Sequence, residues 1–155
     1  MEDEIKVAKI RNGTVIDHIE PGQALNVLKI LGVNDSTVDS TVIVGMRVQS
    51  VKMPAKMKDI VKIEERELDQ STVDKIALIS PDATIVIIRD HYVAKKFKVE
   101  IGDCVKGLAR CSNPNCITNK GEPIPPEFDV ISRKPPVLRC RYCERTLTKI
   151  SENLM

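Results

Sequence analysis

Two closely spaced pairs of cysteines near the end of the chain constrain its fold more than any other feature. Four residues separate Cys111 from Cys116, two separate Cys140 from Cys143, and 23 residues lie between the pairs. Such pairs, each carried by a short loop or hairpin, let four sulfur atoms converge tetrahedrally on one ion. The spacing therefore predicts a four-thiolate metal site in the last third of the chain.

Zinc is the metal that this ligand set favours. Acidic residues follow Met1 without an apolar run, so we expect no signal peptide, a cytoplasmic location and reduced thiols rather than disulfides. Iron also occupies four-cysteine sites, in rubredoxin-like and cluster proteins, but nothing in the sequence indicates redox chemistry. Four sulfur ligands leave no position for water or substrate. We therefore expect one structural zinc ion per chain rather than a catalytic one.

The segment that carries the cysteines differs in composition from the rest. Prolines and asparagines become frequent from about Gly102, which places a boundary near residue 100 and predicts domains over residues 1–100 and 101–155. Residues 101–155 hold 9 Lys and Arg against 6 Asp and Glu, a net charge of +3 that partly offsets the −2 of a zinc ion with four thiolates. The fifth cysteine, Cys104, is expected to be a buried thiol without a role, because free cysteines are often buried.

Turn and capping signals divide the first 100 residues into helices and strands. Asn12-Gly13 favours a hairpin turn, Pro21 suits the first turn of a helix, and Gly32 suits its end. A second helix begins near Ser71, a candidate cap, and stops at Pro81. β-branched and alternating runs predict the strands. The expected helices span 21–31 and 71–80. The expected strands span 5–10, 14–19, 41–48, 59–64 and 83–88, with a break at Met53-Pro54 between the third and the fourth. Residues 92–101 either prolong the last strand or form its neighbour.

The order of these elements predicts the fold class. After the opening strand it reads β-α-β-β-α-β, which is typical of a ferredoxin-like antiparallel sheet with both helices on one face, an α+β fold. A small β-rich domain with the four cysteines follows. The strands are rich in Ile and Val on both alternating sets, so the uncovered face would be apolar, and we expect a partner or self-association there. The longest apolar runs, such as 85–88, are too short to span a membrane.

Several motifs together resemble a known family. Gly13–Ile19 reads GTVIDHI, Lys58–Glu64 reads KDIVKIE, and the cysteine unit follows in one 155-residue chain. The whole chain resembles the regulatory chains of aspartate carbamoyltransferase. That resemblance implies a non-catalytic chain of pyrimidine biosynthesis that binds CTP, ATP and often UTP in its first domain, pairs with itself there, and docks its zinc domain onto the catalytic trimer.

The resemblance also implies which residues bind the nucleotide. Lysine ammonium groups would neutralise triphosphate oxygens, Asp17 and His18 would hydrogen-bond ribose or phosphate, and apolar strand residues would hold the base. His91 stands where many relatives have Tyr, and Val86 stands where some have Asn. The preference among CTP, ATP and UTP therefore stays open. The residues that match the family's nucleotide site are Val7, Ile10, Asp17, His18, Lys62, Ile88, Val93 and Lys96.

Two other classes of function remain to be weighed against a regulatory chain. A zinc-ribbon nucleic-acid binder fits the basic second domain, but only Phe128 and Tyr142 are available there for base stacking. A nucleotide-using enzyme would need a glycine-rich phosphate loop or clustered carboxylates, which the sequence lacks. An Asp17–His18 catalytic pair is not expected, because adjacent strand residues point to opposite faces. We therefore expect no enzyme, no nucleic-acid partner and no membrane attachment.

Overall fold

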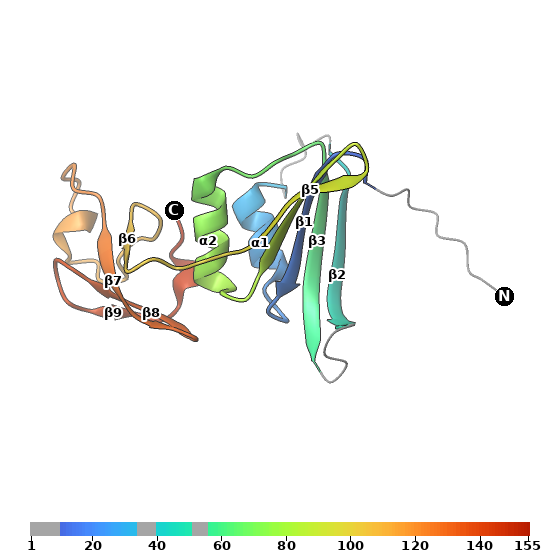
Figure 1. The fold of residues 1–155 in the computed structure, drawn as a ribbon. Coiled ribbons are helices and arrows are strands. Elements are labelled where there is room, and N and C mark those ends of the chain that lie inside the picture. Colours follow the sequence, from blue (N-terminus) through green and yellow to red (C-terminus); the bar gives the residue numbers. More distant parts are fainter. Residues whose placement is uncertain (1–9, 34–39, 51–55) are drawn as a thin grey trace.

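The computed structural model describes residues 10–33, 40–50 and 56–155. They form three layers: a twisted sheet, two helices on one of its faces, and a small β domain beyond the helices (Figure 1). No helix among the described residues is long and apolar enough to cross a membrane. The α+β class predicted from the sequence is confirmed.

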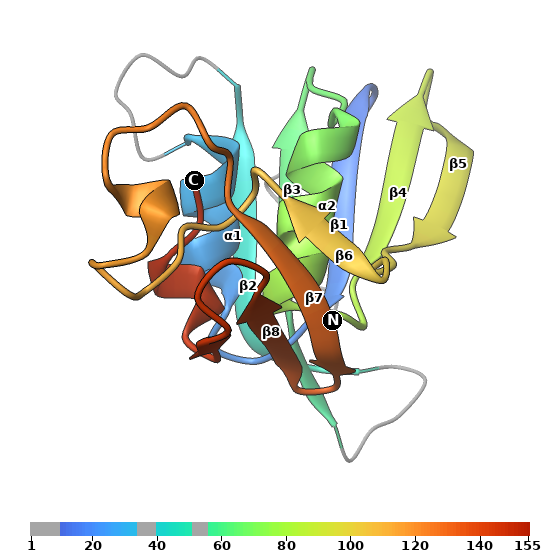
Figure 2. The ribbon, with the colours of Figure 1, turned by 90° about the vertical axis from the view of Figure 1, so that its left-hand side faces the viewer.

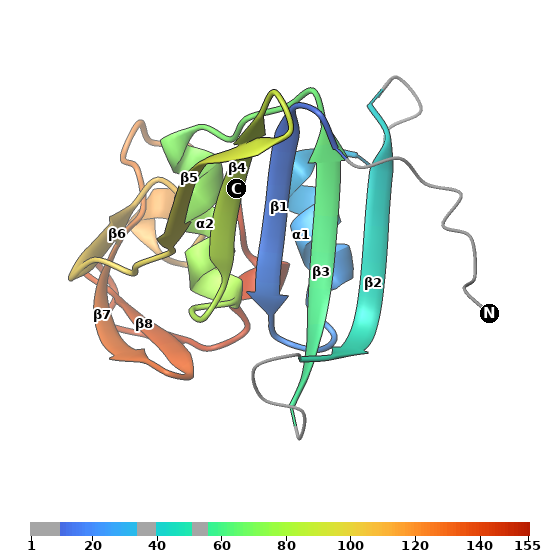
Figure 3. The same cartoon turned by 45° about the vertical axis from the view of Figure 1, so that its right-hand side comes forward.

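The large sheet has five antiparallel strands in the order β2-β3-β1-β4-β5. This is the ferredoxin-like order with one strand added, because residues 92–98 pair beside the preceding strand instead of prolonging it (Figure 3). The strand predicted over 5–10 and the break at Met53-Pro54 lie outside the described residues, apart from Ile10. The elements are β1 (Gly13–Ile19), α1 (Ala24–Leu31), β2 (Val42–Gln49), β3 (Met57–Glu64), α2 (Gln70–Ile79), β4 (Thr84–Arg89) and β5 (Tyr92–Lys98). We call this set the α+β domain.

The helix ends show where local signals succeed. Gly32 ends α1 with φ +73°, a left-handed conformation that glycine adopts without strain, so that predicted end is confirmed. The predicted start at Pro21 was wrong, since α1 begins at Ala24. The predicted cap of α2 was also wrong: Asp69, not Ser71, caps the helix, and its carboxylate accepts a hydrogen bond from the Thr72 N–H at 2.8 Å.

The core of the α+β domain lies between the sheet and the helices. Alternate residues of the central strands point to the helices and are fully buried, among them Ile16, Val61 and Ile85. Val27 of α1 and Ile76 of α2 pack against them. Among the described residues of this domain the buried core side chains are all aliphatic, and Phe97 of β5 packs against them from a partly buried position.

One carboxylate is completely buried beside this core. Asp59 on β3 accepts hydrogen bonds from the backbone N–H groups of Gly22 and Ala24, at 3.0 and 3.1 Å, through Oδ2, and from that of Arg47, at 2.8 Å, through Oδ1. The first two donors lie at the start of α1, where N–H groups lack partners within the helix. Asp59 therefore links the start of α1 and the backbone of β2 to β3.

The small β domain contains a second antiparallel sheet, in the order β6-β7-β8-β9. Figure 2 shows strands β6, β7 and β8 of this sheet in front of the helices. Phe128 and Leu138 are fully buried between the sheet and the segments around it. Ile150 is buried in a short 3₁₀ segment, η2 (Ile150–Glu152), that contacts α2. Cys104 is exposed, so its predicted burial was wrong: it lies on a strand of three residues whose middle residue alone faces the interior. The strands are β6 (Cys104–Lys106), β7 (Glu127–Arg133), β8 (Pro136–Cys140) and β9 (Thr146–Leu147).

Candidate metal centre and ligand-binding face

The four predicted cysteines meet at one point of the small β domain. Cys111 and Cys116 bracket a loop that leads into η1 (Ile117–Asn119), Cys140 ends β8, and Cys143 lies in the turn that follows. Their Sγ atoms all lie within 4.8 Å of one another. The pairs that touch are formed across the two loops, Cys111 with Cys143 at 3.5 Å and Cys116 with Cys140 at 3.7 Å.

These separations fit a tetrahedral metal site. Sulfur atoms at about 2.3 Å from a zinc ion at tetrahedral angles would be about 3.8 Å apart. The two Sγ–Sγ contacts, 3.5 and 3.7 Å, come within a few tenths of an ångström of that value. The arrangement holds four thiolates and leaves no side for a substrate. A metal ion held there would therefore have a closed set of four sulfur ligands, as structural sites do.

Hydrogen bonds around the cysteines fix the loop that carries the first pair. The Asn119 side chain donates to the backbone carbonyl oxygens of Cys111 and Asn113, at 2.9 and 2.8 Å. The Thr118 hydroxyl donates to the Cys116 sulfur at 3.2 Å, and the Tyr142 N–H lies 3.4 Å from the Cys140 sulfur. Such contacts orient metal ligands and stabilise thiolates.

Burial makes two of the four thiols, Cys111 and Cys140, poor acids without a cation. Removal from water is the largest cause that raises the pKa of the Cys111 thiol, to about 12. Burial likewise raises the pKa of Cys140. A divalent cation reverses this preference, because coordination deprotonates a thiol outright. Cys143 differs: burial raises its pKa, but hydrogen bonds from the Arg145 N–H and the Asn113 side chain outweigh that and lower it to about 7. A bound metal is therefore needed mainly to bring Cys111 and Cys140 into the charged form.

The second candidate site is the face of the large sheet that points away from the helices. A row of directly paired residues crosses all five strands there. Directly paired residues of neighbouring strands point to the same face of a sheet. Because the alternate residues of these strands face the helices and form the core, this row lies on the opposite face. The apolar members of the row are partly buried, and Lys96 at its end is exposed. In strand order the row is Ile43, Lys62, Val15, Val86 and Lys96.

Most of the residues that the family resemblance implies lie on this face. Ile88 pairs with Gly13 and Val93 in the row next to the lysines, and Asp17 pairs with Thr84 on the other side. The structure therefore brings Asp17, Lys62, Ile88, Val93 and Lys96 to one surface. Ile10 is buried beside Gly13, and Val7 lies outside the described residues.

A bulge in β1 places His18 next to Asp17. His18 has φ +55°, and the pairing of β1 with β3 shifts at this point. Its Nδ1 lies 3.2 Å from the Thr84 hydroxyl and 4.0 Å from the Asp17 carboxylate, whose other oxygen accepts a hydrogen bond from the His18 N–H. The expectation that these two side chains point to opposite faces was wrong, because it assumed a regular strand.

Lys58 is a neighbour of this pair that sequence reasoning missed. Its Nζ lies 2.8 Å from Asp17 Oδ1, and its side chain is 15% exposed. Burial is the largest single influence on Asp17 and raises its pKa, but the hydrogen bonds from Lys58 and from the His18 N–H together lower it below the ordinary value. Asp17 is thus a carboxylate held in its charged form.

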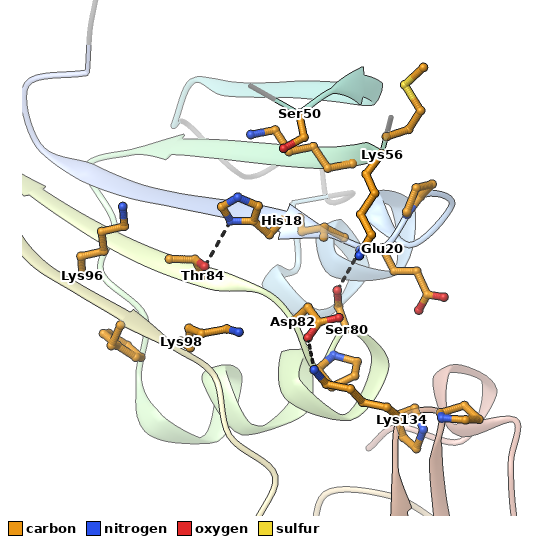
Figure 4. A pocket seen from close by; sticks show the side chains of 18 residues that line it. His18, Glu20, Ser50, Lys56, Ser80, Asp82, Thr84, Lys96, Lys98 and Lys134 are labelled. Atoms are coloured by element: carbon orange, nitrogen blue, oxygen red, sulfur yellow. Dashed lines mark hydrogen bonds and ion pairs between the residues drawn. The ribbon is translucent and has the colours of Figure 1, made fainter. Parts of the chain in front are cut away.

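A hollow of about 1090 Å³ opens beside His18 and reaches the small β domain. Figure 4 shows His18, Thr84 and Lys96 along one part of its wall, and Ser80, Asp82 and Lys134 along another. Lys62, Ile88 and Val93 lie outside it. Two pairs of lysines that line the hollow are spaced two residues apart, Lys56 with Lys58 and Lys96 with Lys98, and residues at this spacing in a strand share a face. This spacing is visible in the sequence and could have pointed to the hollow. The lysines that line the hollow are Lys56, Lys58, Lys96, Lys98 and Lys134.

Comparisons with known proteins agree with this arrangement. Residues 5–100 match the family model described as "Aspartate carbamoyltransferase regulatory chain, allosteric domain", and residues 103–152 match the corresponding metal binding domain. A regulatory chain from Methanothrix thermoacetophila is 53% identical over 156 residues, covering 100% of this chain and 99% of its own length. Those from Thermofilum pendens and Thermoplasma volcanium are 54% and 52% identical, over 96% of this chain and 92% and 95% of theirs.

Proposed function

The chain belongs to the family of aspartate carbamoyltransferase regulatory chains, and on that premise we propose that it carries nucleotide effector signals to a catalytic trimer. Residues 1–100 form the nucleotide-binding allosteric domain and residues 101–155 the zinc domain that docks the catalytic chain. The effectors are CTP, ATP and UTP, and the process they control is pyrimidine biosynthesis in the cytoplasm. The chain itself is non-catalytic.

The residue row across the large sheet is the observation that carries the nucleotide assignment. It provides two ammonium groups, Lys62 and Lys96, with partly buried aliphatic side chains between them. Lysines act as point charges for phosphate oxygens, and an apolar surface flanked by polar groups suits a base and ribose. Asp17 and His18 supply hydrogen-bonding groups at the edge of the same surface.

Zinc is the metal we assign to the cysteine cluster. The sulfur separations support a tetrahedral ion of its size, and all four ligands are soft. Its role is to hold the small β domain, whose exposed apolar side chains then offer a docking surface for the catalytic chain. Those side chains include Ile117, Ile131 and Tyr142.

Self-association of the α+β domain is part of the proposal. β2 is an edge strand with an exposed second half, and an exposed strand edge can pair with another chain. Exposed apolar side chains gather at this end of the sheet, on β2 and its neighbour: Met46, Val48 and Met57. A second copy paired along β2 would cover them.

Reconstitution with a catalytic subunit tests the effector assignment. Carbamoyl transfer by the complex should respond to CTP, ATP or UTP, and Lys62→Gln and Lys96→Gln should each weaken nucleotide binding by about tenfold, because each removes a positively charged contact to the nucleotide. Lys29→Gln removes an exposed lysine from α1, on the helical side of the sheet, and serves as the control. Unchanged nucleotide affinity in both sheet variants would refute the assigned surface.

A further inference from the structure

The hollow that opens beside His18 is shared by the two domains. Its floor comes from the α+β domain, and the Lys134–Pro136 hairpin turn between β7 and β8 of the small β domain closes one side (Figure 4). Lys134 reaches across and pairs with Asp82, Nζ to Oδ1, at 2.5 Å. Among ion pairs between described residues, this pair alone joins residues 10–100 to residues 103–155.

The hollow has more positive than negative charge. Five lysines line it, against the two carboxylates of Glu20 and Asp82. Lys58 is neutralised by Asp17 and Lys134 by Asp82. Within the described part of the chain, the other three form no ion pair: Lys56, Lys96 and Lys98.

The Asp82–Lys134 pair can be opened at little cost. The two side chains are 56% and 63% exposed, and exposed ion pairs add little to stability. The hydrogen bond from Lys134 is the largest cause that lowers the pKa of Asp82, and the charges of Lys98 and Lys56 lower it further. Asp82 therefore occupies a position in which several lysines favour negative charge. A phosphate group would be favoured there for the same reason.

We propose that the phosphate end of an effector bound at His18 and Lys96 extends through this hollow and replaces Asp82 as the partner of Lys134. This inference rests on the proposed function, because it takes the effector to be a nucleoside polyphosphate. Lys134 is then a ligand-binding residue of the β7–β8 hairpin turn: it pairs with Asp82 of the α+β domain without effector and with the phosphate of the effector when one is present. Effector binding thereby changes the contacts of the domain that docks the catalytic chain, and this change does not require any rearrangement of the core.

A double-mutant cycle separates this exchange from a merely structural ion pair. If Lys134 only neutralises Asp82, then Lys134→Gln has no effect once Asp82→Asn has removed the charge. If Lys134 binds phosphate, Asp82→Asn frees it and tightens binding, and Lys134→Gln still weakens binding in that background. Lys134→Arg keeps the charge and should keep most of the affinity.

The measurement is binding of inorganic tripolyphosphate and of CTP and ATP to the full-length zinc-loaded chain by calorimetry. We expect Asp82→Asn to tighten tripolyphosphate binding about threefold, and Lys134→Gln to weaken it about fivefold in both backgrounds, as for loss of one partly exposed charged contact. Lys149→Gln removes an exposed lysine from the same domain and should change binding less than twofold. A change of less than twofold by Lys134→Gln in the Asp82→Asn background would overturn the proposal.

The reconstituted complex supplies the functional readout. At saturating nucleotide, Lys134→Gln should reduce the maximal change in carbamoyl transfer, whereas Lys149→Gln should leave it intact; an undiminished maximal response would overturn the coupling role. If Lys134→Gln does not fold, judged by zinc content and thermal unfolding, Asp82→Asn alone must tighten tripolyphosphate binding or the proposal fails. Absence of any nucleotide or tripolyphosphate binding to the unmodified chain would refute the proposed function itself, which distinguishes the two failures.

Discussion

The α+β domain and the small β domain bury their interiors by different means. In the α+β domain, two helices cover one face of a five-stranded sheet and enclose a continuous aliphatic core. The small β domain has short strands and few large buried side chains, chiefly Phe128 and Leu138, and three of its buried residues are cysteines of the cluster. One domain is held by its core, and we propose that the other is held by a metal ion.

The difference explains where each domain tolerates irregularity. In the α+β domain the β1 bulge and the buried Asp59 are held by many contacts across the sheet, so a residue of the candidate site such as His18 can take a strained conformation. In the small β domain the loop geometry follows from the positions of four sulfur atoms. Loss of the ion should therefore affect one domain and spare the other.

Metal removal provides the largest expected effect. Structural zinc sites contribute on the order of 10 kcal/mol to folding, so Cys116→Ser should unfold residues 103–155 and release the catalytic partner while the α+β domain keeps its structure. Hydrogen exchange resolved by residue, together with zinc content, measures this. Cys104→Ser, which alters the exposed cysteine outside the cluster, is the control and should retain both zinc and assembly.

Mercurial titration is a second route to the same test, best carried out in the Cys104→Ser background so that only cluster thiols react. If the amides of the small β domain stayed protected after complete metal loss, the contrast between the two domains would collapse. The small core around Phe128 would then be sufficient on its own.

Asp59 gives the next effect, confined to the α+β domain. Asp59→Ala leaves three backbone N–H groups without their acceptor and should lower the free energy of unfolding of this domain by about 3 kcal/mol. Asp59→Asn keeps one acceptor oxygen and should cost less. Chemical denaturation measures the loss, and zinc content should not change.

Asp103→Ala, in which an exposed carboxylate that pairs with Arg133 is removed, is the matched control and should be nearly neutral. A loss below about 1 kcal/mol for Asp59→Ala would mean that water replaces the carboxylate, and the domain would depend on its aliphatic core alone.

The same contrast shows what a sequence can predict here. The cysteine site followed from spacing, because a tetrahedral ion fixes the geometry of ligands that are close in sequence. The helix end at Gly32 followed from local conformation. The order of the sheet followed from the order of elements, since few topologies accommodate it.

What sequence reasoning missed depends on pairing between distant residues. The His18 bulge became visible only in the shift of register between β1 and β3, and it reversed the expected side-chain alternation. Lys58 and Asp59 lie side by side on β3, yet one pairs with Asp17 and the other fastens α1. The alternation of apolar and polar residues along a strand cannot predict such contacts, because it does not show which residues of other elements lie next to each side chain.

The smallest expected effect concerns the cap of α2. Hydrogen bonds from the Thr72 side chain and then from its N–H hold the pKa of Asp69 below its ordinary value. A carboxylate with a lowered folded pKa stabilises the fold above its unfolded pKa, and that contribution is lost as the pH falls through the folded pKa. The protection factor of the Thr72 amide, which corrects for the pH dependence of intrinsic exchange, should therefore fall in acid in the unmodified chain. Asp69→Asn keeps a capping oxygen without a titrating group and should remove this acid dependence, whereas Ser71→Ala should preserve it. If Ser71→Ala lowered the protection of the Thr72 amide more than Asp69→Ala did, Ser71 would be the cap after all. The start of α2 would then depend on Ser71, whose side chain is exposed in this fold.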